Sequence, residues 1–302
     1  MVSKKSSGTK TYNFPHPMDN DTLVGHMATI KNFMDAWRAR DTHPIHPVWI
    51  FTGPRGIGKA TLAYKIAKNV YGNVGDFFIV DKDRNIDKDG KSKPDVKTIS
   101  VHTVRAMIEK MQMSSMSGQW RVVIIDSLDE LHTSASNAIL KLLEEPPEKT
   151  LFLLVAHQLA NVLPTIRSRA RVEKMRPLTI SELRDLCIKF MPDEEVSSET
   201  LKLVNGSFGK IADMKKSGGD AIYSDLIDLL RNDSANSTDI MMIAKKIAGA
   251  PELYTLILDA VATFGLADIY QDVTKSIANM NRLNLEEETA IFKIITEIKK
   301  CL

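Results

Sequence analysis

The stretch that decides the fold is Val48-Trp-Ile-Phe-Thr52, followed directly by Gly53-Pro-Arg-Gly-Ile-Gly-Lys59. Five consecutive apolar or β-branched residues indicate a strand that is buried on both faces, as in a parallel sheet. The next seven residues match the pattern G-x-x-x-x-G-K, in which backbone N–H groups surround phosphate oxygens and the lysine bridges the terminal phosphates. A glycine-rich turn without a ligand would not require this lysine or this spacing. The sequence therefore predicts a phosphate-binding strand, loop and helix.

Two positions of the predicted nucleotide site differ from those of a site that hydrolyses ATP. The residue after the lysine normally supplies a hydroxyl to Mg²⁺, but here it is Ala60, and Thr61 lies one position late, about 100° further around the helix. A second strand, Arg121-Val-Val-Ile-Ile-Asp126, ends in the expected carboxylate, but the glutamate that would polarise water is replaced by Ser127. We therefore expect ATP or ADP binding with weak or absent hydrolysis, and we leave the presence of Mg²⁺ open.

Composition excludes several classes of protein. The chain has 302 residues, of which 43% are hydrophobic, and its net charge of +2 is far from that of a dedicated nucleic-acid binder. No apolar run approaches the ~20 residues of a transmembrane helix. Cys187 and Cys301 form no CxxC pair, so we predict neither a disulfide nor a zinc or other metal site. These features favour a cytoplasmic protein.

The hydrophobic pattern changes along the chain. We predict a flexible tail over 1–20 and an α/β nucleotide-binding domain over 21–176, with strands at 48–52, 77–80, 121–125 and 151–156. A helical lid domain is predicted over 177–235, opened by the capping box of Thr179 and Glu182. An all-α domain follows over 236–302.

The helices of the second half are predicted from apolar residues at helical spacing. We expect helices over 181–190, 197–204, 208–216 and 219–232, a linker over 233–238, and then two or three more helices. A set of isoleucines near the end of the chain is expected to face an internal core: Ile291, Ile294, Ile295 and Ile298.

Several further segments carry a family resemblance. They are Trp120 to Asp126, Asn137-Ala-Ile-Leu-Lys-Leu-Leu-Glu-Glu-Pro-Pro147, Leu163-Pro-Thr-Ile-Arg-Ser-Arg169 and Gly206-Ser-Phe-Gly-Lys210. With the phosphate loop, and in this order, they resemble the clamp-loader branch of the AAA+ ATPases, and within it the delta prime subunits of bacterial DNA polymerase III. The resemblance spans about 23–212. It implies an AAA+ P-loop domain with a parallel sheet, a helical lid and a C-terminal helical collar.

The resemblance also implies roles for individual residues. Arg169 matches an arginine finger that acts in trans on nucleotide held by a neighbouring subunit, and His157 matches the first sensor. The second sensor falls near Gly209 or Lys210. The residues expected to contact nucleotide are Gly53, Pro54, Arg55, Gly56, Ile57, Gly58, Lys59, Ala60, Thr61, Asp126 and His157.

The implied function is that of a stator subunit in the clamp loader of DNA polymerase III. Its partners would be motor subunits of the gamma or tau type and a delta-like subunit, with the sliding clamp and primer-template DNA reached through the assembly. An active motor ATPase is the alternative, which Lys59, Asp126 and the intact glycine frame would permit. Asp129 and Glu130 follow the strand, but we expect them to start the next helix and favour its dipole rather than to replace the base. A P-loop phosphotransferase is a third alternative. Any DNA polymerase activity would belong to the holoenzyme.

A charged stretch at 81–94 invites a calcium-loop interpretation. Asn85, Asp87, Asp89 and Gly90 have the spacing of an EF-hand loop. The twelfth position is Val96 rather than glutamate, however, and a proline interrupts the loop. We therefore predict a solvated turn, at the place where relatives often carry a four-cysteine zinc module.

Overall fold

The computed structural model describes residues 14–71, 76–94, 98–112, 119–194, 196–250, 253–283 and 286–302. Residues 1–13 of the predicted tail and Val96 therefore lie outside the described residues. The chain divides into two compact units. One contains 14–192 and 206–209, and the other contains the described parts of 193–205 and 210–302. The finer division into tail, nucleotide-binding domain, lid and collar stays a prediction.

The first unit is built on a five-stranded sheet in which every pairing is parallel. The strand order is β2-β3-β4-β1-β5, with bounds Phe77–Asp81, Arg121–Asp126, Thr150–Ala156, Val48–Thr52 and Arg171–Lys174. The first four strands confirm the prediction to within one residue. The fifth, β5, was missed because it is short, charged and at the edge of the sheet, where half-exposed residues carry no apolar run.

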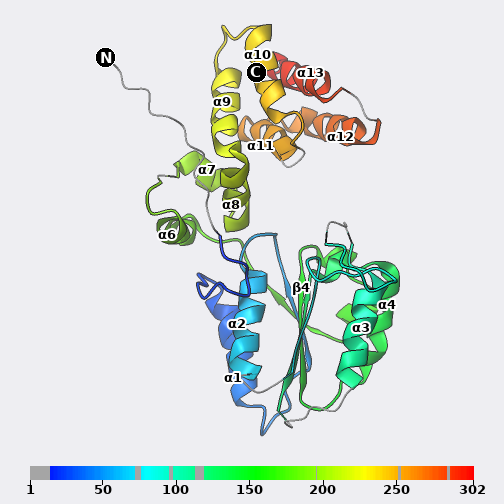
Figure 1. Cartoon of the computed structure of the whole chain (residues 1–302). Helices are drawn as coiled ribbons and strands as arrows, with labels where there is room; N and C mark the ends of the chain where they lie inside the picture. Colours follow the sequence, from blue (N-terminus) through cyan, green and yellow to red (C-terminus); the bar gives the residue numbers. More distant parts are fainter. Residues whose placement is uncertain are drawn as a thin grey trace. The chain divides into compact units, whose positions relative to one another are not determined.

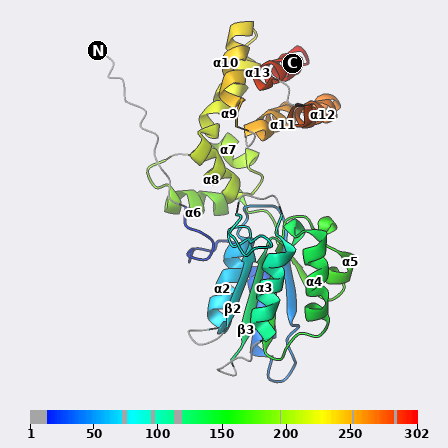
Figure 2. The ribbon, with the colours of Figure 1, turned by 45° about the vertical axis from the view of Figure 1, so that its right-hand side comes forward.

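The two faces of the sheet bury alternate residues of each strand. Trp49 and Phe51 belong to the core that packs against α1 (Met27–Arg38) and α2 (Lys59–Tyr71). Val48, Ile50 and their neighbours belong to the core beneath α3 (Val101–Gln112) and α4 (Thr133–Glu144). Figure 1 shows these helix pairs on opposite sides of the sheet, and in the turned view of Figure 2 the strands again lie between α2 and α4. The predicted α/β fold with a parallel sheet is confirmed.

The carboxyl ends of the central strands meet at one edge of the sheet. Strand β1 leads into the phosphate loop, β3 leads into the short helix η1 (Leu128–Glu130), and β4 leads into η2 (Leu159–Asn161) and α5 (Pro164–Arg167). Ligands of parallel α/β sheets bind outside this edge. Helix α6 (Ile180–Phe190) completes the first unit.

The second unit is entirely helical within the described residues. It contains α7 (Ser198–Leu203), most of α8 (Phe208–Ser217), and α9 to α13, with bounds Gly219–Arg231, Ser237–Ile247, Tyr254–Thr263, Ala267–Leu283 and Glu287–Lys300. Among the residues described after the linker there are therefore four helices, rather than two or three. The isoleucines of α13 are at most 3% exposed, which confirms their place in an internal core.

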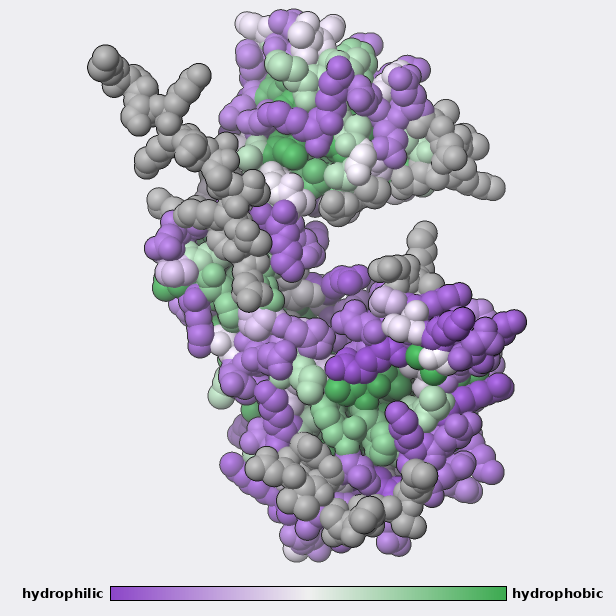
Figure 3. Space-filling view, in the orientation of Figure 1, coloured by the Kyte–Doolittle hydropathy of each residue, from purple (hydrophilic) through white to green (hydrophobic). Residues whose placement is uncertain are grey.

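The surface is dominated by polar side chains. On the face drawn in Figure 3, hydrophilic residues cover most of each unit and apolar residues show only in patches between them. No helix within the described part of the chain is long and apolar enough to span a membrane.

The central strand β4 provides a test of this packing. Leu154 is fully buried in the core beneath α3 and α4, so Leu154→Ala is expected to lower the free energy of unfolding by about 2–5 kcal/mol. Val172→Ala on the edge strand, where Val172 is only partly buried, is the control and should cost less. Urea unfolding measures both, and a loss below about 1 kcal/mol for Leu154→Ala would contradict the described core.

Candidate functional site

The lysine of the phosphate loop is buried without a counter-ion. Lys59 is 3% exposed, and its Nζ donates to the carbonyl oxygens of Gly53 at 2.8 Å and Pro54 at 2.6 Å. Among the described residues no carboxylate forms an ion pair with it, and burial lowers its pKa to about 8 although the charges of Asp126 and Asp129 oppose the shift. A buried ammonium bonded only to carbonyls is suited to an entering anion, so the loop fits the phosphate groups of a nucleotide.

The loop is also held from outside by the start of α8. Gly56 has a φ of +76°, and a Cβ added there would meet Ser207 Oγ at 2.4 Å. The backbone N–H of Gly209 donates to the carbonyl of Gly56 at 2.9 Å, and Ser207 Oγ donates to the carbonyl of Arg55 at 2.8 Å. The segment 206–209 therefore supports the loop through one backbone N–H and one side-chain hydroxyl. At this position near the predicted second sensor, Gly209 offers no side chain.

The end of β3 carries a polar chain in place of a catalytic base. Ser127 is 4% exposed, and its Oγ lies 3.2 Å from Asp126 Oδ1 and 2.8 Å from His157 Nε2. Where Ser127 donates to Asp126, His157 donates to Ser127 through Nε2. Burial, followed by the charge of Lys59, lowers the pKa of His157 to about 4, so this imidazole is neutral at pH 7. A hydroxyl held in this way has neither the charge nor the basicity to activate water.

The two acids beyond Ser127 are occupied by structural contacts. Asp129 accepts the backbone N–H groups of His157 at 3.0 Å and Gln158 at 2.8 Å, so it fixes the loop after β4. Glu130 pairs with Lys82 at 3.0 Å and lies 3.7 Å from Arg55. Both lie in the short helix η1, and neither is placed as a free base. They do not replace the glutamate that is absent at Ser127.

The metal side of the site is correspondingly sparse. Burial raises the pKa of Asp126 above its usual range, while the hydrogen bond from Ser127 and the charge of Lys59 oppose the shift. Thr61 is 7% exposed, and the position beside the lysine is Ala60. Within the described residues there is no group of three or more His, Cys, Asp or Glu that could hold a metal ion. Asp126, at the end of β3, is the carboxylate expected to meet a nucleotide-bound cation.

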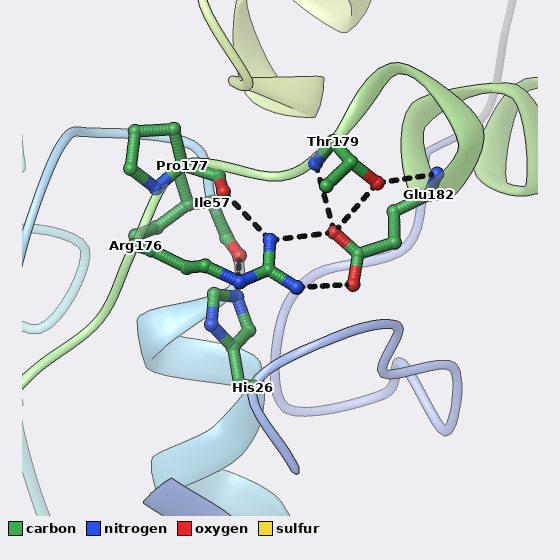
Figure 4. A network of polar contacts seen from close by, with 6 residues as sticks. All are labelled: His26, Ile57, Arg176, Pro177, Thr179 and Glu182. Atoms are coloured by element: carbon green, nitrogen blue, oxygen red, sulfur yellow. Dashed lines mark hydrogen bonds and ion pairs between the residues drawn. The ribbon is translucent and has the colours of Figure 1, made fainter. Parts of the chain in front are cut away.

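A polar network on the other side of the loop was missed in the sequence. Nε2 of His26 lies 2.7 Å from the carbonyl oxygen of Ile57, and Arg176 forms two bonds of 2.7 and 2.8 Å to the carboxylate of Glu182 (Figure 4). Glu182 also completes the predicted capping box with Thr179, which is confirmed. The hydrogen bonds from Arg176, and from the backbone N–H and hydroxyl of Thr179, hold the pKa of Glu182 at about 2.

Close packing explains part of this arrangement. A Cβ at Gly25, whose φ is +76°, would lie 2.8 Å from Glu182 Oε1. Gly25 itself was the available signal in the sequence, because a glycine often stands where the backbone needs a positive φ or approaches another segment closely. Together these residues connect the entry to α1, the phosphate loop and the start of α6.

The predicted site residues thus fall into two places. The phosphate loop, Asp126 and His157 come together at the carboxyl edge of the sheet. Arg169 lies after α5, where its contacts are with Thr165, Ser168 and Glu144 and not with the phosphate loop.

The titration of Lys59 generates a prediction. Because a bound polyphosphate favours the charged ammonium, ADP binding should take up a proton above pH 8, and affinity should fall between pH 8 and 9.5. Lys59→Met should bind ADP weakly at every pH, while the control Lys68→Met, an exposed residue of the same helix, should follow wild type. Calorimetry in buffers of different ionisation enthalpy measures the proton uptake. A flat affinity profile in the wild type would contradict the assigned environment of Lys59.

The close approach of the loop to α8 generates another. In Gly209→Ala the new Cβ would lie 2.7 Å from Gly56 Cα, so the loop must shift. We expect a loss of about 1–3 kcal/mol in unfolding free energy and weaker ADP binding. Gly219→Ala is the matched control, because its Cβ would meet side-chain ends and no backbone: Leu253 Cδ2 at 2.8 Å, Ser217 Oγ at 3.2 Å and Leu256 Cδ1 at 3.6 Å. Equal behaviour of the two variants in thermal unfolding and ADP titration would show that the contact does not support the loop.

Comparison with known proteins agrees with this geometry. A delta' subunit of DNA polymerase III from Yersinia pestis is 41% identical over 98 residues, covering 32% of this chain and 26% of that protein. The tau subunit of DNA polymerase III from Escherichia coli is 28% identical over 168 residues, covering 51% of this chain and 25% of that protein. The matched stretches therefore span about a quarter of each relative.

One solved structure shares the fold over nearly the whole chain. It is a DNA polymerase III gamma subunit-related protein from Thermotoga maritima, with a TM-score of 0.51 and 15% identity, covering 91% of this chain and 99% of that one. At this identity the similarity concerns the fold alone.

The family model described as DNA polymerase III, delta subunit, matches residues 28–179. The match includes the phosphate loop, the strand that ends in Asp126 and the segment that carries Arg169, and it confirms the resemblance found in the sequence. Since these residues make up just over half of the chain, the protein belongs to the DNA polymerase III delta subunit family.

Proposed function

We propose that this chain is a delta prime-like stator subunit of a DNA polymerase III clamp loader. It binds ATP or ADP in its phosphate loop without efficient hydrolysis, and it presents Arg169 to nucleotide held by a neighbouring motor subunit. In the assembly it helps to load a sliding clamp onto primed DNA, in the cytoplasm.

The observation that carries this proposal is the hydrogen-bonded Ser127. The position where a motor needs a carboxylate base holds a hydroxyl that is bonded to Asp126 and His157. The two nearest acids are engaged with backbone N–H groups and with cations. Ala60 also removes the hydroxyl that would position Mg²⁺. These features support binding of nucleotide in a site that lacks the groups for hydrolysis.

The role of Arg169 is supported by its place in the fold. A guanidinium keeps its charge at all relevant pH values and presents a planar fork that suits phosphate oxygens. Arg169 is 36% exposed and makes no contact with its own phosphate loop. Its partners in the proposal are motor subunits of the gamma or tau type and a delta-like subunit, because relatives carry the names delta' and tau.

The alternative is that the chain is itself a motor ATPase. The observations in its favour are that Lys59 belongs to the phosphate loop and that Asp126 lies at the end of β3. A motor ATPase requires a catalytic base, and the nearest acids, Asp129 and Glu130, are engaged in other contacts. A P-loop phosphotransferase is less well supported, because the matched family is that of a polymerase subunit.

Steady-state ATPase measurements separate these functions. The isolated chain should be inert, and Arg169→Ala should lower turnover at the facing motor site by on the order of 10³ in an assembly reconstituted with its motor and delta-like subunits, clamp and primed DNA. Lys59→Ala should leave the assembly nearly unchanged. Arg105→Ala, at an exposed position of α3, is the control. Turnover by the isolated chain that vanishes in Lys59→Ala would instead identify a motor.

A further inference from the structure

The partner of Arg169 lies at the end of α4. Glu144 is the last residue of this helix, and its Oε1 lies 2.7 Å from Arg169 Nη2. A carboxylate at the C-terminal end of a helix is disfavoured by the helix dipole, so this position is unfavourable for Glu144 unless a cation lies close by. Its neighbour Glu145 is also exposed and makes no such ion pair among the described residues. The contact is therefore specific to one of two adjacent glutamates.

The guanidinium of Arg169 has two further contacts on its other terminal nitrogen. Nη1 donates to the carbonyl oxygen of Thr165 at 2.8 Å and to Ser168 Oγ at 3.3 Å. With the ion pair to Glu144, these bonds occupy three of the five N–H donors of the group. Among the described residues, two donors are left for a second anion. Arg169 can thus be held in one orientation and still bind phosphate.

The exposure of the pair determines whether Glu144 only restricts the rotamers of Arg169 or holds it so firmly that it could not bind phosphate. The side chains of Arg169 and Glu144 are 36% and 46% exposed, respectively. An ion pair so open to water is weak, and it cannot hold a guanidinium against the larger charge of a nucleotide phosphate. It can nevertheless restrict the rotamers of a long side chain before binding, which lowers the entropy lost when the chain meets its target.

We propose that Glu144 is a positioning residue for Arg169, which orders the guanidinium for a phosphate group of nucleotide bound by another subunit. This inference rests on the proposed function, in which Arg169 acts in trans. Glu144 itself does not contact the nucleotide. The carboxylate orients the guanidinium by accepting its hydrogen bond. An uncharged side chain with an oxygen at the same place should therefore replace it.

The test measures the ATPase of the reconstituted assembly with variants of this chain. Glu144→Ala should lower kcat at the site facing Arg169 by about two- to tenfold, the cost of ordering one flexible side chain, with KM for ATP unchanged. Glu144→Gln should restore most of the rate, because its amide oxygen accepts the same hydrogen bond. Glu145→Ala is the matched control and should equal wild type. Thermal unfolding of each full-length variant verifies that the fold is retained.

A double mutant separates positioning from a structural effect. Glu144→Ala should change nothing further in an Arg169→Ala background. A Glu144→Ala rate equal to or above wild type, in an assembly where Arg169→Ala is slow, would overturn the positioning role alone. Loss of rate by Glu144→Ala that persists in the Arg169→Ala background would also overturn it. No effect of Arg169→Ala itself would overturn the proposed function and this inference together.

Discussion

Parallel pairing of β1 between β4 and β5 is the constraint on which the site depends. The register aligns Thr52 of β1 with Ala156 of β4, and Asp126 of β3 with Val155. Three loops therefore leave the sheet at one edge: the phosphate loop, the turn after Asp126 and the turn that carries His157. Both faces of these strands are buried, so a slip in register would place polar residues in the core. The chemistry of the site is in this sense a consequence of hydrophobic packing below it.

At that edge, most of the polar side chains form hydrogen bonds with other groups of the protein and are not left open for a ligand. Asp129 binds two backbone N–H groups, and Ser127 joins Asp126 to His157. The Lys59 ammonium is bonded to two carbonyl oxygens, and Nδ1 of His157 is buried with no partner among the described residues. A site of this kind retains its attraction for phosphate and lacks a free base. This combination is the physical basis for the proposal that the chain binds nucleotide without hydrolysing it efficiently.

Support for the site comes from segments far away in sequence. His26 contacts the loop from the start of α1, and Gly209 contacts it from the start of α8. Arg176 and Glu182 stabilise the start of α6 between them. The phosphate loop therefore depends on contacts outside the strand, loop and helix that its motif defines. Gly25 and Gly56 allow these contacts, because a Cβ at either position would clash with Glu182 or with Ser207 and Gly209.

The sequence by itself determined the parallel α/β fold, four of the five strands and the phosphate loop, because long apolar runs and a glycine-lysine motif are local signals. It also identified the missing hydroxyl at Ala60 and the missing base at Ser127. Only the tertiary structure revealed β5, the network of His26, Arg176 and Glu182, and the pairing of Arg169 with Glu144. These features join residues that are distant along the chain and carry no local periodicity. Their contacts exist only after the hydrophobic core has brought the segments together.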